Sequence, residues 1–263
     1  MYPETKPIIF KCPRDEDFVE IYPIHDTHFG NKYCDVKKYL QLRKFILSAR
    51  NRYVIWVGDL MENALPGSKS DPLEQALSPF EQQEFIIEQF KLLKDRTIAI
   101  IDGNHEGNRS LRFAGLYPLF TAAAIAGISD RFRSAYAVVD IAVGHGADGH
   151  DNRQQRYSGY VSHIAKNTKN MSIADYLEGF DFALFGHDHD VDSHPREHLC
   201  YDKTTKSFSQ KSIVTADAGS YLWYNGYPAR GGMKPKSTRT NKIILYGGRN
   251  ERIEVLEFDP KHL

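Results

Sequence analysis

The sequence contains little cysteine and no long apolar run. Its three cysteines, Cys12, Cys34 and Cys200, match no metal-binding spacing and cannot all pair with one another. We therefore expect reduced, packed thiols, as in a cytoplasmic protein. No stretch approaches 18 apolar residues, and the first residues lack the apolar core of a secretory signal, so we expect neither a membrane span nor export.

The chain also lacks an excess of charge of either sign. Lys plus Arg and Asp plus Glu both number 34, so the overall field favours no charged partner. Any contact with nucleic acid must then come from a local basic patch. We find no internal repeat, low-complexity segment or linker, and 263 residues fit one large domain. We therefore expect residues 1–263 to form a single domain.

Apolar, β-branched runs recur along the chain, and each ends in a polar motif. Such runs are typical of buried strands, and open α/β sheets bind ligands at the carboxyl ends of their strands. We therefore expect the side chains of these motifs to converge. The motifs are Asp26-Thr27-His28 after 18–24, Gly58-Asp59 after 53–57, Gly103-Asn104-His105-Glu106 after 97–101, Gly144-His145-Gly146 after 136–143, and Gly186-His187-Asp188-His189 after 182–185.

Helical spacing of apolar residues separates these runs. It predicts helices over 36–49 with Asp35 as the N-cap, from Ser78 to about residue 94, and over 111–126 with a kink or division at Pro118. We also interpret 157–166 and 172–178 as helical. From residue 194 onward the pattern changes to turn-separated strands, which indicates an antiparallel part of a second sheet.

The polar motifs supply seven metal donors of mixed chemistry. Carboxylates, imidazoles and an amide oxygen suit manganese, iron or zinc rather than calcium. No cysteine takes part, which argues against a closed structural zinc site. One carboxylate can bridge two ions and leave three donors for each, and two ions about 3.5–4 Å apart can hold both oxygens of an in-line displacement at phosphorus. The seven are Asp26, His28, Asp59, Asn104, His145, His187 and His189.

The five motifs, in this order over residues 18–190, resemble those of the calcineurin-like metallophosphoesterase superfamily. The resemblance implies an α/β/β/α sandwich with two divalent metal ions, manganese first and iron or zinc as alternatives. It implies attack on phosphorus by a metal-bridging hydroxide, with His105 stabilising the phosphoryl oxygens and protonating the leaving oxygen. It also places Glu62 as a support for His105. The first metal would be held by Asp26, His28 and His189, and the second by Asn104, His145 and His187, with Asp59 as the bridge.

The fourth motif leaves an alternative open. His150 competes with His145 as the ligand, and we favour His145 because it directly follows a predicted strand, as the other ligands do. We interpret the remaining histidines as ordinary loop or core residues. These are His25, His163, His194, His198 and His262.

Two departures bear on the substrate. Phe29 separates His28 from Gly30, and Glu62-Asn63-Ala64 stands where phosphoprotein phosphatases have Asp-Arg-Gly, although Glu106 agrees with that branch. The pattern Asp-x-His-hydrophobic-Gly instead resembles the manganese-dependent DNA-repair exonuclease branch. This favours a phosphodiesterase acting on nucleotides or nucleic acid.

A basic stretch near the end could grip a phosphodiester. Aromatic residues at 221–227 precede Arg230, Lys234, Lys236 and Arg239, and such a loop could bind a strand by charge and stacking. An exposed loop beside core aromatics is the competing interpretation. Two other functions stay open, which are a phosphomonoesterase or protein phosphatase, and a catalytically silent binding module stabilised by metal.

Overall fold

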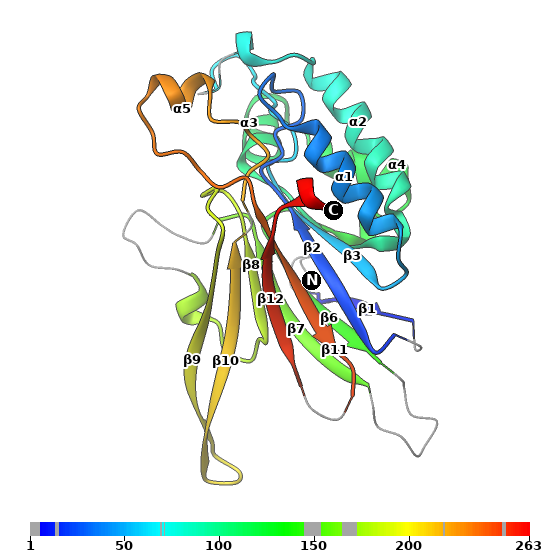
Figure 1. Ribbon diagram of the computed structural model, residues 1–263, viewed down its shortest axis with the longest axis vertical. Coiled ribbons are helices and arrows are strands. Elements are labelled where there is room, and N and C mark those ends of the chain that lie inside the picture. The colour runs from blue at the N-terminus through cyan, green and yellow to red at the C-terminus, as the bar shows by residue number, and fades with distance from the viewer. Residues whose placement is uncertain are drawn as a thin grey trace.

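The computed structural model describes residues 6–13, 16–68, 70, 72–144, 154–164, 173–217, 219–248 and 251–263. Within them the chain forms two six-stranded sheets lying face to face, and helices cover the outer face of one sheet (Figure 1). Each sheet mixes parallel and antiparallel pairs. The predicted α/β fold, with two stacked mixed sheets flanked by helices, is confirmed.

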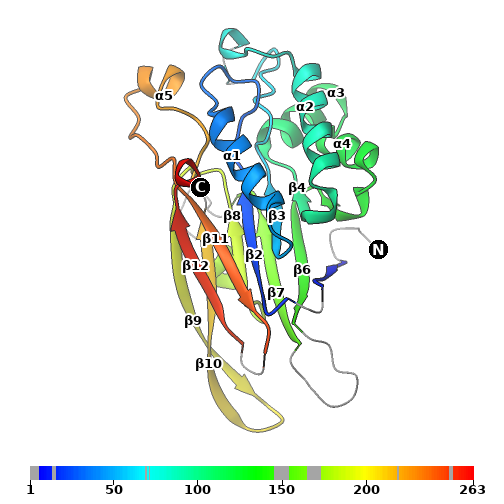
Figure 2. The same ribbon diagram turned by 45° about the vertical axis from the view of Figure 1, so that its right-hand side comes forward.

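The two sheets are named A and B here. Sheet B carries the motif-bearing strands β2, β3 and β4 side by side and parallel. In spatial order, sheet B consists of β12 (Ile253–Phe258), β11 (Thr240–Tyr246), β2 (Phe18–Ile24), β3 (Arg52–Val57), β4 (Thr97–Ile101) and β5 (Phe132–Arg133). Sheet A consists of β1 (Ile8–Lys11), β6 (Tyr136–Val143), β7 (Gln155–Ser162), β8 (Phe182–Phe185), β10 (Ser207–Asp217) and β9 (Asp192–Asp202). Figure 2 shows the β9–β10 hairpin extending well beyond the other strands.

The central strands of sheet B, β3 and β4, are buried on both faces, which explains their continuous apolar sequences. Side chains alternate in direction along β3, so Ile55 and Val57 pack into the core between the sheets. Val54 and Trp56 point the opposite way and pack beneath the helices. A strand with apolar residues on both faces has an unbroken apolar sequence, as residues 53–57 have.

Four α-helices lie over the outer face of sheet B (Figure 1). The Asp35 side chain caps the first by accepting from the Lys38 N–H, and Ser78 and Glu81 form a capping box on the second. The expected division at Pro118 is also present, with Gly115 ending one helix before Pro118 begins the next. The helices are α1 (Val36–Leu47), α2 (Pro79–Leu92), α3 (Arg109–Ala114) and α4 (Pro118–Ala126), with a short α5 (Gly226–Arg230) in the β10–β11 connection.

The outer face of sheet A has a smaller cover. A 3₁₀ turn, Ile173–Tyr176, lies where a helix was predicted, and Ala174 and Leu177 pack against Phe185 and Ile213. The helix predicted over 157–166 is wrong, because residues 155–162 form β7. Burial alternates along β7, with Tyr157, Gly159 and Val161 inside, which is the period of a strand.

Two expectations from composition can be checked directly. Cys12, Cys34 and Cys200 are all free thiols. Among the described residues, no helix has the length and apolar character needed to cross a membrane.

We expect Trp56→Ala to lower the free energy of unfolding by about 3–5 kcal/mol, the usual range for deleting a buried aromatic side chain. The indole is fully buried, packs edge-on against Phe90 and donates to Thr97 Oγ1 at 3.0 Å. Urea unfolding followed by circular dichroism would measure the change. Trp223→Ala is the matched control, since that side chain is 50% exposed, and its loss should cost within about 1 kcal/mol. Equal losses in the two variants would contradict the prediction.

Candidate metal centre

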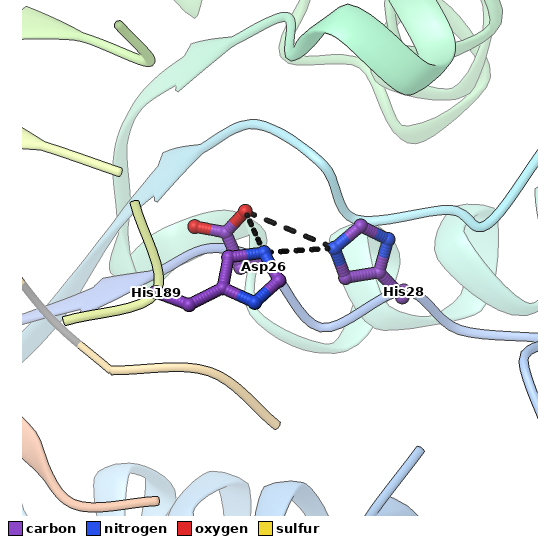
Figure 3. A group of neighbouring side chains, drawn as sticks. All are labelled: Asp26, His28 and His189. Atoms are coloured by element: carbon purple, nitrogen blue, oxygen red, sulfur yellow. Dashed lines mark hydrogen bonds and ion pairs between the residues drawn. The ribbon is translucent and has the colours of Figure 1, made fainter. Parts of the chain in front are cut away.

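Three predicted ligands converge at the end of β2. The Nε2 atoms of His28 and His189 lie 3.3 Å apart, and the His189 nitrogen lies 3.1 Å from Asp26 Oδ1 (Figure 3). The His28 nitrogen lies 3.8 Å from the same oxygen. These residues, called the first donor cluster, come from segments more than 160 positions apart in the sequence. Together they can offer one oxygen and two nitrogens to a single ion.

The hydrogen bonding of Asp26 tests whether a cation fits there. Asp26 Oδ2 accepts a hydrogen bond from the His187 N–H at 2.8 Å and is also hydrogen-bonded to His25 Nδ1. Oδ1 is buried, has no hydrogen-bond partner among the described residues, and lies within 4 Å of both imidazoles. A buried carboxylate oxygen without a hydrogen bond is costly unless a cation meets it. The first donor cluster therefore fits a divalent metal ion.

A second group of donors surrounds Asp59. Asp59 Oδ2 lies 3.2 Å from His163 Nε2, and the same nitrogen lies 3.2 Å from Asn104 Oδ1. The His187 ring is near the His163 ring, with centroids 5.3 Å apart, and can offer a nitrogen to the same ion. Asp59, Asn104, His163 and His187 form the second donor cluster. Its one carboxylate, one amide oxygen and two imidazoles suit the same metals as the first cluster.

Asp59 lies between the two clusters. Its carboxylate can share an ion with His163 and His187, and it also lies within reach of a nitrogen of His28 from the first cluster. Close backbone contact of two strand ends makes this placement possible. A Cβ on Gly103 would lie 2.1 Å from the Asp59 amide nitrogen, and a Cβ on Gly58 would lie 2.5 Å from the Gly103 nitrogen. Glycine is needed at both positions, which explains the two glycines in the motifs.

The backbone of both clusters is strained. Asp26, His28, Asp59, His187 and His189 all have φ between 45° and 74°. This left-handed conformation is uncommon for residues other than glycine and costs of order 1–3 kcal/mol each. A left-handed residue reverses the chain sharply after a strand, which turns the donor side chain back toward the sheet end. Five of the seven predicted ligands have this conformation.

His105 lies next to the second cluster, and its imidazole forms a further group of possible donors with His28 and Asp59. Its amide N–H donates to Asp59 Oδ1 at 2.8 Å, and its Nδ1 contacts the main-chain oxygen of Glu62 at 2.8 Å. That contact orients the ring and leaves Nε2 turned toward the cluster, 3.7 Å from Asp59 Oδ2. Burial lowers the pKa of His105 to about 4, against the opposing effect of the Asp59 charge.

The Glu62 side chain has a different partner from the one expected. Its carboxylate pairs with His28 Nδ1 at 3.3 Å and accepts from Asn31 Nδ2 at 3.0 Å, and only its main-chain oxygen meets His105. Burial raises the pKa of Glu62, but the His28 contact, the nearby His105 imidazole and a hydrogen bond from Ser70 together outweigh it, and the pKa falls to about 2. An ionised Glu62 thus orients a ligand of the first donor cluster.

Two further side chains brace the loops of the site. Glu106 accepts from the amides of Leu60 and Met61, which fixes the turn after Asp59. Burial, with the nearby Asp59 charge, raises the pKa of Glu106 to about 8. Asn63 donates to the main-chain oxygen of His105 at 2.6 Å and to Ser110. The loops of the second and third motifs are therefore tied together by polar contacts.

Sequence reasoning missed two histidines of the site. His163 directly follows β7 and enters the second donor cluster, and His25 contacts the Asp26 carboxylate. His145 and His150 lie outside the described residues. The strand before them, β6, is antiparallel to β7, so its last residue, Val143, pairs with the first residue of β7 at the opposite end of the sheet from His163. The strand-end rule would have found His163 had β7 been recognised.

A pocket of about 350 Å³ opens over both clusters. It is lined by His28, Asn31, Asp59, Glu62, Ser70, Glu74, Asn104, His105, Arg109, His187, His189, Leu222 and Pro228. Five of the seven predicted metal ligands line it, together with His105 of the third motif; these five are His28, Asp59, Asn104, His187 and His189. The lining therefore combines metal donors with Leu222 and Pro228 of the β10–β11 connection.

The predicted substrate-binding residues lie in the β10–β11 connection and mostly have acidic partners. Arg230 pairs with Glu74 at 2.7 Å, Lys236 with Asp190 at 2.6 Å, and Arg239 with Glu257 at 3.0 Å. The same connection contacts the metal loop, because the Tyr221 N–H and Ser220 Oγ both donate to the Asp26 main-chain oxygen. The basic residues thus contribute less uncompensated charge than their number indicates.

Comparison with known proteins gives matches in structure alone. No protein-family model and no curated protein sequence matches the chain. The structure is similar to YfcE, a phosphoesterase from E. coli, with 12% identity, a TM-score of 0.44, and 92% of this chain and 99% of that chain covered. It is similar to the calcineurin-like phosphoesterase YfkN from Bacillus subtilis, with 11% identity, a TM-score of 0.46, and coverage of 94% and 92%. It is also similar to the nuclease MPE from Pseudomonas putida, with 14% identity, a TM-score of 0.38, and 90% of this chain and 87% of that chain covered. Because the identities and TM-scores are low, the functional conclusion below is drawn from the geometry of this chain's own site.

Proposed function

We propose that this protein is a metal-dependent phosphoester hydrolase that binds two divalent cations. The observation that carries the proposal is the pair of adjacent donor clusters with Asp59 between them and an open pocket above. Asp26, His28 and His189 would hold one ion, and Asn104, His163 and His187 the other, with Asp59 shared. Manganese is the proposed metal, with iron or zinc as the alternatives, because carboxylate, imidazole and amide donors without thiolate suit all three. When bound, the two cations would supply Lewis-acid activation and charge neutralisation at phosphorus.

His105 is the proposed general acid of the reaction. Its Nδ1 is engaged by the Glu62 main-chain oxygen, so Nε2 is the nitrogen free to face a substrate in the pocket. Because Nδ1 keeps the proton that it donates to the Glu62 oxygen, Nε2 carries a proton only in the imidazolium form, which a bound phosphate anion would favour against the effect of burial. That proton could be donated to the leaving oxygen as it departs from phosphorus. This part-buried contact with the backbone keeps the ring in its orientation before a substrate arrives, which lowers the entropic cost of proton transfer.

We propose a small phosphodiester, of nucleotide size, as the substrate. A pocket of about 350 Å³ matches a small organic ligand, and α5 with its flanking residues forms one wall of it. Three of the four basic residues proposed to grip nucleic acid are already paired with carboxylates. A polyanionic strand gains little from cations that are neutralised in this way. These contacts favour a small diester over an extended polynucleotide.

A substrate panel tests this proposal. The protein, purified with manganese, would be assayed on bis(p-nitrophenyl) phosphate, p-nitrophenyl phosphate, cyclic nucleotides, and single- and double-stranded DNA. Hydrolysis of the small diesters with little cleavage of DNA is expected. Cleavage of the monoester alone would move the protein to the phosphomonoesterases. Two bound metal ions without turnover on any substrate would overturn the hydrolase proposal in favour of a binding module.

Glu62→Gln is expected to weaken the first metal site by roughly ten- to a hundredfold, the usual effect of changing a residue that orients a ligand. Glutamine keeps the shape and the contact with Asn31, but it removes the negative charge that holds His28. Manganese titration by calorimetry would measure the change. The His105 contact is through the main chain and should persist, so turnover at saturating manganese should fall much less than metal affinity. Unchanged affinity would remove this role from Glu62.

A further inference from the structure

Arg109 lies beside the proposed general acid and was not singled out by any sequence motif. It is the first residue of α3 and lines the pocket together with His105 and Glu62. Its Nη1 donates to the main-chain oxygen of Glu62 at 3.0 Å, the same atom that His105 Nδ1 contacts at 2.8 Å. One carbonyl oxygen therefore positions both the imidazole and the guanidinium.

Only one corner of the guanidinium is used to hold it in place. Nη1 also donates to Ser70 Oγ at 2.9 Å and lies 3.4 Å from the Asn63 main-chain oxygen. All three contacts run through this single nitrogen, and the described residues provide no hydrogen-bond partner for Nε or Nη2. An arginine has five N–H donors arranged in a planar fork. Those on Nε and Nη2 therefore stay available to a ligand.

No carboxylate among the described residues contacts Arg109 directly, although the charge of Glu62 lies nearby. Two of the three Arg109 contacts are to neutral main-chain oxygens and the third is to a hydroxyl. The other arginine near the pocket, Arg230, differs, because the Glu74 carboxylate pairs with it. A half-buried guanidinium without a carboxylate contact is suited to an anion, and its fork geometry matches two oxygens of a phosphoryl group.

We propose that Arg109 binds a non-bridging phosphoryl oxygen of the substrate through Nε and Nη2, next to His105. This inference rests on the proposed function, because it assigns the oxygen contact of the same phosphoester. The metal donors would hold the phosphoryl group from one side, and Arg109 would hold it from the side of α3. The residue would thus select for a tetrahedral oxyanion and fix its orientation relative to His105.

Inorganic phosphate tests the assignment without requiring turnover. Its affinity for the manganese-loaded protein would be measured by calorimetry, with metal content measured in parallel by mass spectrometry. Arg109→Met should bind phosphate roughly ten- to a hundredfold more weakly while two manganese ions are retained, since charge-assisted hydrogen bonds are lost. Arg109→Lys should be intermediate, because a single ammonium cannot contact both the Glu62 carbonyl and a phosphoryl oxygen in the same way.

Arg112→Met is the matched control. Arg112 lies on the same helix, is exposed, and is not among the pocket residues, so its replacement should leave phosphate affinity unchanged. Wild-type affinity in Arg109→Met would overturn the inference, and wild-type affinity in Arg109→Lys would do so if the methionine variant did not fold. A wild-type protein that binds no manganese would overturn the proposed function and this inference with it. Phosphate binding by the metal-loaded wild type, unchanged by either Arg109 substitution, would overturn the inference alone.

Discussion

Asp59→Asn should reduce metal-dependent phosphodiester hydrolysis by about a thousandfold or more, equivalent to roughly 4 kcal/mol of transition-state stabilisation. Asp59 is almost fully buried and is the carboxylate common to both donor clusters. Asparagine can preserve the acceptor for the His105 amide at Oδ1, but it replaces Oδ2 with an NH₂ group that faces His163. The variant therefore loses a negative charge and gains a donor where a cation is expected.

The measurement is turnover of the most active small diester, with manganese content determined on the same samples. Asp140→Asn is the matched control, because Asp140 lies on β6 and pairs with Arg156 outside the pocket. That control should keep wild-type turnover and two manganese ions. Turnover of the Asp59 variant within tenfold of the wild type would rule out a shared, catalytically essential carboxylate at this position.

His163→Ala should remove one of the two manganese ions and lower turnover by at least about a hundredfold. His163 is buried, and its Nδ1 lies 2.7 Å from the main-chain oxygen of Val57, which directs Nε2 to Asp59 and Asn104. Such backbone contacts are typical of metal-binding imidazoles. Burial lowers the pKa of His163, but the charges of Asp59 and Asp26 and the hydrogen bonds to Asp59 and Val57 together outweigh it and raise the pKa to about 10. The raised pKa means that the carboxylate environment of His163 stabilises positive charge, as a cation site requires.

His145→Ala is the paired experiment, because the sequence favours His145 for the same metal. If His163 is the ligand, the His145 variant keeps both manganese ions and most of its turnover. Loss of one ion in His145→Ala, with two ions retained in His163→Ala, would reverse the assignment. Metal content per protein, measured after gel filtration, decides between the two without any knowledge of the natural substrate.

The first three motifs could be predicted because each follows a strand with a strong local signal. Residues 53–57 and 97–101 are unbroken apolar runs, and both are buried strands of sheet B. A rule that joins strand ends to ligands then identifies Asp59 and Asn104 without knowledge of tertiary contacts. The N-caps of α1 and α2, Asp35 and Ser78, could be predicted for the same reason, because a cap depends only on residues next to it in the sequence.

His163 was missed because its strand has a weaker pattern. β7 contains serine, glycine and arginine, and its tyrosines at 157 and 160 fit helical spacing as well as a strand. Only pairing with β6 and β8, which are distant or separated by turns, decides in favour of the strand. Propensity was overridden by tertiary context. The same applies to Glu62, whose side chain meets His28 because loops from two motifs pack together.

The partners of the basic residues were also beyond local reasoning. Arg230 meets Glu74 across 156 positions of sequence, and Lys236 meets Asp190 across 46. Charge counted along a segment says nothing of carboxylates brought in from other elements. A basic stretch is therefore weak evidence for nucleic-acid binding until its ion pairs are known.

The left-handed backbone at five donor positions lowers the stability of the fold but positions the metal donors. At of order 1–3 kcal/mol each, these conformations together cost about as much as the whole net stability of a typical domain. Glycine at any of the five positions would relax the backbone, yet it would remove a metal donor. Selection for stability alone would thus drive the chain toward glycine and an empty site. Engineering for thermal tolerance should therefore look elsewhere in the chain, since substitutions that stabilise the loops of the site would do so at the expense of its chemistry.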